Sequence, residues 1–348
     1  MNNKPERTKP LRRGGRLPLR ARALGPSEIE EVLKKEGIRH FDEDISKMSR
    51  ERLRELFGAK TTGRINLSLL IKNLIWQAHE GLKAGTVPAF KGNIRSFWYS
   101  PVKPVLSRAD ALTAKSDPYG VMIDMFVRLV MDRRLLRYRT FGFSDEGQTD
   151  RVIGGKNRHI LLIAEKRGHF GLLKEIAGDF DVTVLSLGGQ PSVLSAEYFV
   201  DELKAAGVEL WQDFPLLTYV DYDPSGESIV QSFVRQLKAF GVKGVLRTDL
   251  VAPRNMTEEQ VELNKYALSR RKSERKEIQA WLAQTGGIGG KPYGLEADAM
   301  APAQMVEVFA REVAVYLKLG VEEVKRRREK KRLSRALQHL ILRKLGLG

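Results

Sequence analysis

The spacing of apolar and polar positions changes along this chain and divides it into regions. Between residues 155 and 250, short apolar runs rich in β-forming residues alternate with longer segments of helical period. The runs have the length of buried strands, and the segments between them that of amphipathic helices. Strands are predicted at 159–164, 182–187, 216–220 and 242–246, and helices at 170–177, 193–206 and 228–240. This alternation predicts an α/β fold with a parallel sheet and helices on both faces.

The region before residue 150 has mainly helical periods. Polar residues at cap positions begin the predicted helices at 27–36, 50–57, 67–82 and from 118 onward into Arg133. Segment 92–106 is predicted to be broken by Pro101 and Pro104. Alternating residues at 136–143 predict a strand. Short helices followed by a strand are typical of a winged-helix-like module, which places a helix in or across a DNA groove.

The rest of the chain consists of two ends and a helical region. Residues 1–25 lack periodicity and predict a disordered basic arm. Helices are predicted at 258–270, 273–283, 303–319 and 321–345. Loop 286–290 is rich in glycine but lacks the Lys-Ser/Thr of a phosphate-binding P-loop. The predicted organisation is an arm (1–25), a winged-helix-like domain (26–150), an α/β domain (151–320) and a basic C-terminal helix (321–348).

Charge and composition limit the possible partners. The formal net charge is +17, and most of it lies in segments 1–22 and 321–348. Such a balance favours a polyanionic partner, nucleic acid before an acidic membrane surface, although solvated tails would have the same composition. The chain has no cysteine, which excludes disulfides and thiolate chemistry. It has no long apolar run and no secretory signal, so we expect a cytoplasmic, nucleoid-associated protein without membrane contact.

The candidate chemistry follows the third predicted strand of the α/β region. Asp221 and Asp223 come directly after it, and their i, i+2 spacing turns both side chains to one face. Glu165 ends the first strand, and the carboxyl ends of parallel strands share one edge of a sheet. Three converging carboxylates repel one another unless a proton or cation lies between them, and Mg²⁺ or Mn²⁺ prefers such oxygen ligands. The alternative is a solvated acidic turn that caps a helix.

These motifs, in this order, resemble the Toprim domain. The Asp-Tyr-Asp-Pro-Ser-Gly run at 221–226 resembles the Asp-x-Asp-Pro-x-Gly form of type IIB topoisomerase A subunits (topoisomerase VI) and of the related meiotic double-strand-break transesterase. The Ile-Ala-Glu-Lys run at 163–166 and the Gly-rich turn at 188–192 are similar to further family segments. The resemblance covers roughly residues 60–320, and the short chain looks like the compact stand-alone members called mini-A.

The resemblance also implies a nucleophile upstream. The Arg-Ser-Phe-Trp-Tyr run at 95–99 matches the family motif that carries the catalytic tyrosine, with Ser96 in place of the family's acid and Trp98 in place of Tyr or Phe. Tyr99 would be the nucleophile, and Arg95, one helical turn away, would hold the same phosphate. Glu165, Asp221 and Asp223 would hold the metal. We also predict DNA contacts from Lys103, Arg133, Arg134 and Arg137.

The resemblance implies a DNA-cleaving transesterase. Tyr99 would form a 5′-phosphotyrosyl link in a homodimer that cuts both strands, with each site shared between subunits. Strand passage would need a separate GHKL-type ATPase subunit, because this chain has no ATP motif. Two alternatives stay open: a metal-dependent Toprim nuclease of the plasmid-defence type, in which water replaces Tyr99, and a non-catalytic DNA-binding protein.

Overall fold

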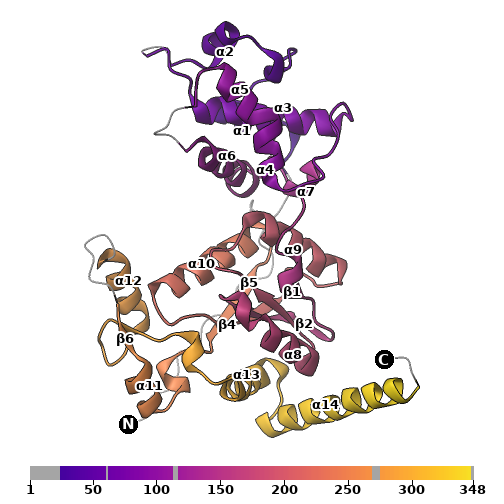
Figure 1. The fold of residues 1–348 in the computed structure, drawn as a ribbon, viewed down its shortest axis with the longest axis vertical. Helices are drawn as coiled ribbons and strands as arrows, with labels where there is room; N and C mark the ends of the chain where they lie inside the picture. Colours follow the sequence, from indigo (N-terminus) through magenta and orange to yellow (C-terminus); the bar gives the residue numbers. More distant parts are fainter. Residues whose placement is uncertain (1–23, 60–61, 113–116, 269–274, 346–348) are drawn as a thin grey trace.

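The protein folds into a helical unit (residues 24–150) and a sheet unit (residues 151–345). Figure 1 shows the helical unit above the sheet unit. The computed structural model describes residues 24–59, 62–112, 117–268 and 275–345. The predicted disordered arm falls almost entirely outside the described residues. The predicted α/β class is confirmed, with a five-stranded, mostly parallel sheet and a helical C-terminal region.

Polar caps begin most helices of the helical unit where the sequence predicts them. Ser49 accepts a hydrogen bond from the Arg52 amide, and Asn66 accepts one from the Leu69 amide, so each satisfies an amide that has no partner within its helix. The first helix begins one residue before Ser27, with Gly25 as its cap. The helices are α1 (Pro26–Glu36), α2 (Arg50–Phe57), α3 (Leu67–Lys83), α4 (Ile94–Phe97), α5 (Lys103–Arg108), α6 (Pro118–Val127) and α7 (Tyr138–Phe141).

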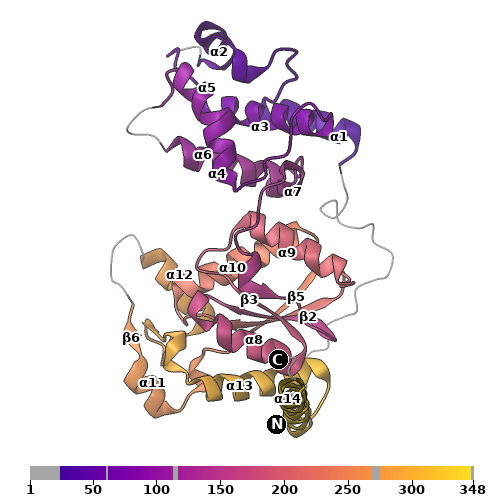
Figure 2. The same cartoon turned by 45° about the vertical axis from the view of Figure 1, so that its right-hand side comes forward.

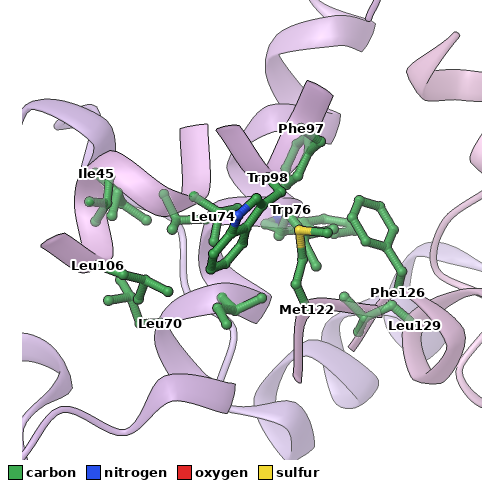
Figure 3. Close-up of a cluster of buried hydrophobic side chains, with 14 of the residues drawn as sticks. Ile45, Leu70, Leu74, Trp76, Phe97, Trp98, Leu106, Met122, Phe126 and Leu129 are labelled. Carbon is green, nitrogen blue, oxygen red and sulfur yellow. The ribbon is translucent and has the colours of Figure 1, made fainter. Parts of the chain in front are cut away.

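One aromatic and aliphatic core holds this unit together. Helix α3 supplies its central row, and the side chains of α4, α5 and α6 pack around it (Figure 3). Phe97, Phe126 and Phe141 are fully buried and meet edge to face at 5.2–5.8 Å between ring centroids. Such ring pairs contribute about 0.5–1.5 kcal/mol each beyond their buried area. The core therefore fixes α4, and the residues that follow it, in one orientation.

Two predictions in this unit are wrong. Pro101 and Pro104 do not break the chain: a π-helical turn, Trp98–Val102, joins α4 to α5. The wider turn bonds the Lys103 amide to the Trp98 carbonyl, five residues back. The strand predicted at 136–143 is wrong as well, because Tyr138 and Phe141 turn into the core from the short helix α7. The described part of this unit contains one isolated bridge, Gly58–Ile65, and no strand, so the winged-helix comparison stays a prediction that rests on helices.

A buried histidine makes the stability of this unit depend on pH. His79 lies between Trp76 and Phe141, and neither ring nitrogen has a hydrogen-bond partner among the described residues. Burial, together with the charge of Lys83, lowers its pKa from 6.5 to about 4. The unfolded chain therefore binds a proton here below pH 6.5, whereas the folded protein binds it only near pH 4.

We expect the free energy of unfolding to fall by about 3 kcal/mol, through this one group, as the pH drops from 6.5 to 4. His79→Phe should remove that part of the pH dependence, because a phenyl ring suits an aromatic site and does not titrate. Urea unfolding at pH 7 and pH 4.5 measures it, with His40→Phe at an exposed histidine as the control. The assignment would be contradicted if His79→Phe lost as much unfolding free energy between pH 7 and pH 4.5 as the wild type.

The sheet unit confirms the four strands predicted from the alternating pattern. The strands run in the order β1-β3-β2-β4-β5; β2 pairs in parallel with β3 and β4, β4 pairs in parallel with β5, and β1 is antiparallel to β3. The short β1 was not predicted. The bounds are β1 (Arg151–Val152), β2 (Asn157–Ala164), β3 (Val182–Ser186), β4 (Asp213–Tyr219) and β5 (Gly244–Asp249).

Helices cover both faces of this sheet (Figure 2). Successive residues of a strand point to opposite faces, and Leu162 and Leu161 accordingly belong to different cores. The first core packs against α8 and α13, the second against α9 and α10. The bounds are α8 (Phe170–Phe180), α9 (Val193–Ala205), α10 (Pro224–Ala239) and α13 (Pro302–Leu317). Burial on both faces explains why the strands read as continuous apolar runs.

The C-terminal part is helical, as predicted, with one added two-stranded antiparallel sheet. The predicted helix at 258–270 ends early, because β6 (Tyr266–Ala267) pairs with β7 (Tyr293–Gly294). The other elements are α11 (Glu258–Asn264), α12 (Arg275–Thr285) and α14 (Val321–Lys344). Helix α14 is anchored to α8 by two arginines, Arg328 and Arg335, on Asp179. No helix of the described residues is long and apolar enough to cross a membrane.

Helices α7 and α9 join the two units. The buried carboxylate of Glu197 on α9 accepts hydrogen bonds from the amides of Tyr138 and Arg139, each at 3.0 Å. The Tyr198 hydroxyl donates to the Phe143 carbonyl. These contacts satisfy the first amides of α7, and they fix the helical unit on the sheet unit.

Candidate active site

Two of the predicted carboxylates lie side by side because their strands are neighbours. Ala164 and Tyr219 are register partners in β2 and β4, and the Glu165 amide donates to the Tyr219 carbonyl at 3.4 Å. Glu165 follows Ala164 directly, and Asp221 lies two residues beyond Tyr219. The structure thus brings both carboxylates to the carboxyl edge of the sheet, as the sequence predicts.

Hydrogen bonds hold the two aspartates in place. One oxygen of Asp223 caps α10 by accepting from the Gly226 amide at 2.7 Å, and the other accepts from the Tyr266 hydroxyl at 2.7 Å. Asp221 accepts from the Ala297 amide at 2.8 Å. A Cβ on residue 226 would lie 2.1 Å from the Asp221 carbonyl oxygen, so only glycine permits this turn. The spacing of the Asp-x-Asp-Pro-x-Gly run is therefore a steric requirement of the turn.

The three carboxylates place several negative charges close together. Burial raises the pKa of Glu165, and the charges of Asp221 and Asp223 raise it further. One carboxylate oxygen of Glu165 is buried and has no hydrogen-bond partner among the described residues. A bound cation or a proton would compensate the desolvation of such an oxygen.

These residues fit an oxygen-preferring divalent cation in their chemistry. All three side chains offer carboxylate oxygens, and the unpartnered oxygen of Glu165 leaves one ligand position open. Within the described ranges, no group of three or more Asp, Glu or His side chains is already gathered closely enough to hold a metal. The three carboxylates are therefore a candidate metal site, because they are suitable ligands and come from neighbouring strands. In this structure the two aspartates instead accept hydrogen bonds from Tyr266 and Ala297.

A lysine that the sequence reasoning did not assign a role balances part of this charge. The ammonium of Lys166 lies 3.4 Å from Asp221 and 2.8 Å from Asp298. Burial alone would lower its pKa, but the hydrogen bond to Asp298 and the charge of Asp221 raise it above the usual value. Asp298 also bonds His169 at 2.8 Å. Lys166 therefore stays charged and links the cluster to the segment before α13.

Tyr266 is the other residue that sequence reasoning missed. It lies in the short strand β6, within a segment predicted as helix, and it is 43 positions from Asp223. Burial raises the pKa of its hydroxyl, and so does its hydrogen bond to Asp223, so it donates to the carboxylate as a neutral phenol. No local motif signals it. Lys166, in contrast, belongs to the Ile-Ala-Glu-Lys run at 163–166, and its position next to Glu165 is the signal for its role.

The predicted nucleophile lies on the other unit and is open to solvent. Tyr99 sits in the π-helical turn after α4, with 61% of its surface exposed. The ammonium of Lys103 lies 5.2 Å from the centre of its ring. The guanidinium of Arg95 lies instead 5.9 Å from the centre of the Tyr119 ring. Lys103, predicted as a DNA contact, is thus the cation over Tyr99, while the shared phosphate contact of Arg95 and Tyr99 stays a prediction.

The remaining predicted DNA contacts have neighbours within the protein. Arg133 donates to the buried carboxylate of Glu36, and Arg137 donates to Asp201 at 2.6 Å. Arg134 lies between α6 and α7 in a left-handed backbone conformation, at a φ of 56°. Arg133 and Arg137 therefore help to hold the fold, and their DNA contacts stay predictions.

A comparison with protein-family models finds none that matches this chain. A comparison with curated proteins finds no match either. The fold and the site define the class: an α/β protein with an N-terminal helical unit and a carboxylate cluster at the carboxyl edge of its parallel strands.

Proposed function

We propose that this protein is a DNA-cleaving transesterase of the type IIB topoisomerase A-subunit kind, with Tyr99 as nucleophile and Glu165, Asp221 and Asp223 as the site of a divalent cation. The observation that carries the proposal is the buried, unpartnered oxygen of Glu165 beside two aspartates at the ends of neighbouring parallel strands. The resemblance of both motifs supports it, and so does the net charge of +17, which suits a phosphate backbone.

In the proposed reaction the Tyr99 oxygen attacks a phosphodiester phosphorus. A bond forms between them, the bond from phosphorus to the 3′ oxygen breaks, and the phenolic proton ends on the released 3′-hydroxyl. A phenol is a weak nucleophile, and the nearby ammonium of Lys103 would stabilise the negative charge that builds on the phosphate. A cation held by the three carboxylates would supply Lewis-acid stabilisation and anchor the DNA backbone.

The placement of the two halves supports a shared site. Tyr99 is exposed in the turn after α4, whereas the carboxylates follow β2 and β4. Figure 1 shows α4 in the helical unit and β2 and β4 in the sheet unit. An exposed nucleophile is free to face the cluster of a second copy. We therefore propose a homodimer in which each site combines Tyr99 of one subunit with the carboxylates of the other. Strand passage would require a separate ATPase subunit.

Metal-dependent hydrolysis is the second candidate, and one observation favours it. All residues of the carboxylate cluster, with Lys166 and Tyr266 around it, come from the sheet unit. Among the described residues, no hydrogen bond or ion pair joins them to Tyr99. A nuclease of this kind would use water as the nucleophile and form no protein–DNA bond. The two proposals differ in their products: transesterification leaves DNA linked to the protein, and hydrolysis leaves free DNA ends. A denaturing gel distinguishes the two.

Asp223→Asn tests the metal role. Asparagine also caps a helix and can accept from Tyr266, so the fold should persist. We expect cleavage to be lost, and the rise in melting temperature that Mg²⁺ gives the wild type to disappear. Stability in EDTA should equal or exceed that of wild type, because repulsion with Glu165 is relieved. Asp213→Asn, at the opposite end of β4, is the matched control. Full cleavage by Asp223→Asn in excess EDTA would rule out the metal site.

A further inference from the structure

A cavity of about 600 Å³ lies between the helical unit and the sheet unit, apart from the carboxylate cluster. Residues of α4 and α6 form its upper wall, and the end of β3, the loop after it and the start of α9 form its lower wall. This size is in the usual range for small-molecule sites. The cavity contains none of the three carboxylates, and Arg95 is the one residue predicted for cleavage that contributes to it.

Its polar groups suit a phosphate. Helix α9, 13 residues long, begins at the wall, where first-turn amides and the helix dipole favour an anion. Arg95 and Arg167 contribute to the same wall. Arg95 has no carboxylate partner in the described part of the chain, so its charge is available to a ligand.

The two acidic residues of the wall are already bonded. Asp150 pairs with Arg167 at 3.0 Å, and Glu146 accepts a hydrogen bond from the side-chain amide of Asn93 at 3.0 Å. Glu146 retains acceptor capacity that suits a sugar hydroxyl. Another part of the wall is apolar and aromatic, which suits the faces of a nucleobase. Its residues include Ile94, Tyr119, Ile123, Val127, Leu194 and Phe233.

We propose that this cavity binds a nucleoside 5′-phosphate. The phosphate would lie at the start of α9, between Arg95 and Arg167, and the base would lie against the apolar wall that includes Tyr119. The same group occurs in a free mononucleotide and at the 5′ end of a DNA strand. Binding in this cavity does not require Tyr99 or a cation, so it can hold even if the proposed cleavage fails.

The cavity also adjoins the candidate active site. The amide of Gly189, in the loop after β3, donates to the carbonyl of Glu165 at 3.1 Å. Gln190 borders this cavity and also the hollow beside Asp223. A strand whose 5′-terminal nucleotide occupies the cavity would therefore lead towards the carboxylates.

Calorimetry with the full chain in EDTA tests the proposal, with adenosine 5′-monophosphate (AMP), inorganic phosphate and a short 5′-phosphorylated DNA strand as probes. We expect saturable binding of AMP, weakened about tenfold or more in Arg167→Gln because a charge-assisted hydrogen bond is lost. Arg50→Gln is the matched control, since Arg50 is also paired with an aspartate, at 2.7 Å, but lies far from the cavity in sequence and in contacts. Asp223→Asn should bind AMP like the wild type.

A second variant keeps the test independent of the ion pair with Asp150. Ile123→Trp should fill the apolar part, so that AMP binds no more tightly than inorganic phosphate. Binding of the 5′-phosphorylated strand without binding of AMP would identify the strand end as the source of the nucleotide. No saturable binding of either nucleotide probe, or equal losses in Arg167→Gln and Arg50→Gln, would overturn the proposal. So would AMP binding that Ile123→Trp leaves unchanged.

Discussion

Tyr99→Phe should abolish DNA cleavage while the protein still folds and still binds DNA. The substitution removes one hydroxyl, and the ring keeps its place in the π-helical turn beside Lys103. Because 61% of the tyrosine is exposed, no buried partner is lost. In wild type, denaturing gels with labelled DNA should show protein-linked 5′ ends, and these should be absent from the variant. The neighbouring Tyr119→Phe, which also keeps its ring, is the control.

The same variant decides between the two candidate chemistries. A hydrolytic enzyme would cut at the wild-type rate without Tyr99 and would show no protein-linked ends. In the shared-site dimer, mixing Tyr99→Phe with Asp223→Asn should restore a fraction of single-strand cleavage, because one site of the mixed dimer has an intact tyrosine and an intact cluster. Cleavage by Tyr99→Phe at full rate would remove the transesterase proposal and leave metal-dependent hydrolysis.

Glu36→Gln should lower the free energy of unfolding by about 3 kcal/mol, the cost of removing one partner from a buried ionic cluster. The Glu36 side chain is 1% exposed, and it bonds Lys72 at 2.9 Å and Arg128 at 2.8 Å, with Arg133 as its third cation. Glutamine fills the same volume but leaves three positive charges close together without their anion. The loss concerns the helical unit, where α1, α3 and the end of α6 meet at this carboxylate.

Urea unfolding measures this effect, with Glu31→Gln as the matched control. Glu31 also pairs with a lysine, at 2.7 Å, but both side chains are exposed, and solvent-exposed ion pairs contribute little to stability. Burial raises the pKa of Glu36, but hydrogen bonds from its three cations outweigh burial and lower it to about 2. Its contribution should therefore be full above pH 4.5 and be lost as the pH falls towards 2. Equal stabilities of the two variants at pH 7 would show that the cluster adds nothing.

Local sequence patterns predicted many of the helices and strands, and the wrong predictions have physical causes. Ser49, Asn66 and Asp117 cap helices where the sequence places them, since a cap acts on amides two or three residues away. The alternation at 136–143 failed because Tyr138 and Phe141 pack into the aromatic core from a helical turn, so that tertiary burial outweighed the two-residue period.

The sequence by itself determined the α/β alternation, the glycine that the turn at 221–226 requires, and the meeting of Glu165 with Asp221, because strand order and a local turn are enough to place them. Only the tertiary structure decided which groups surround them. Tyr266 contacts Asp223 from the two-stranded sheet of β6 and β7, and Lys166 contacts Asp298, which is 132 positions away in the chain. These partners come from segments that no local period connects, and packing of the sheet unit alone brings them together.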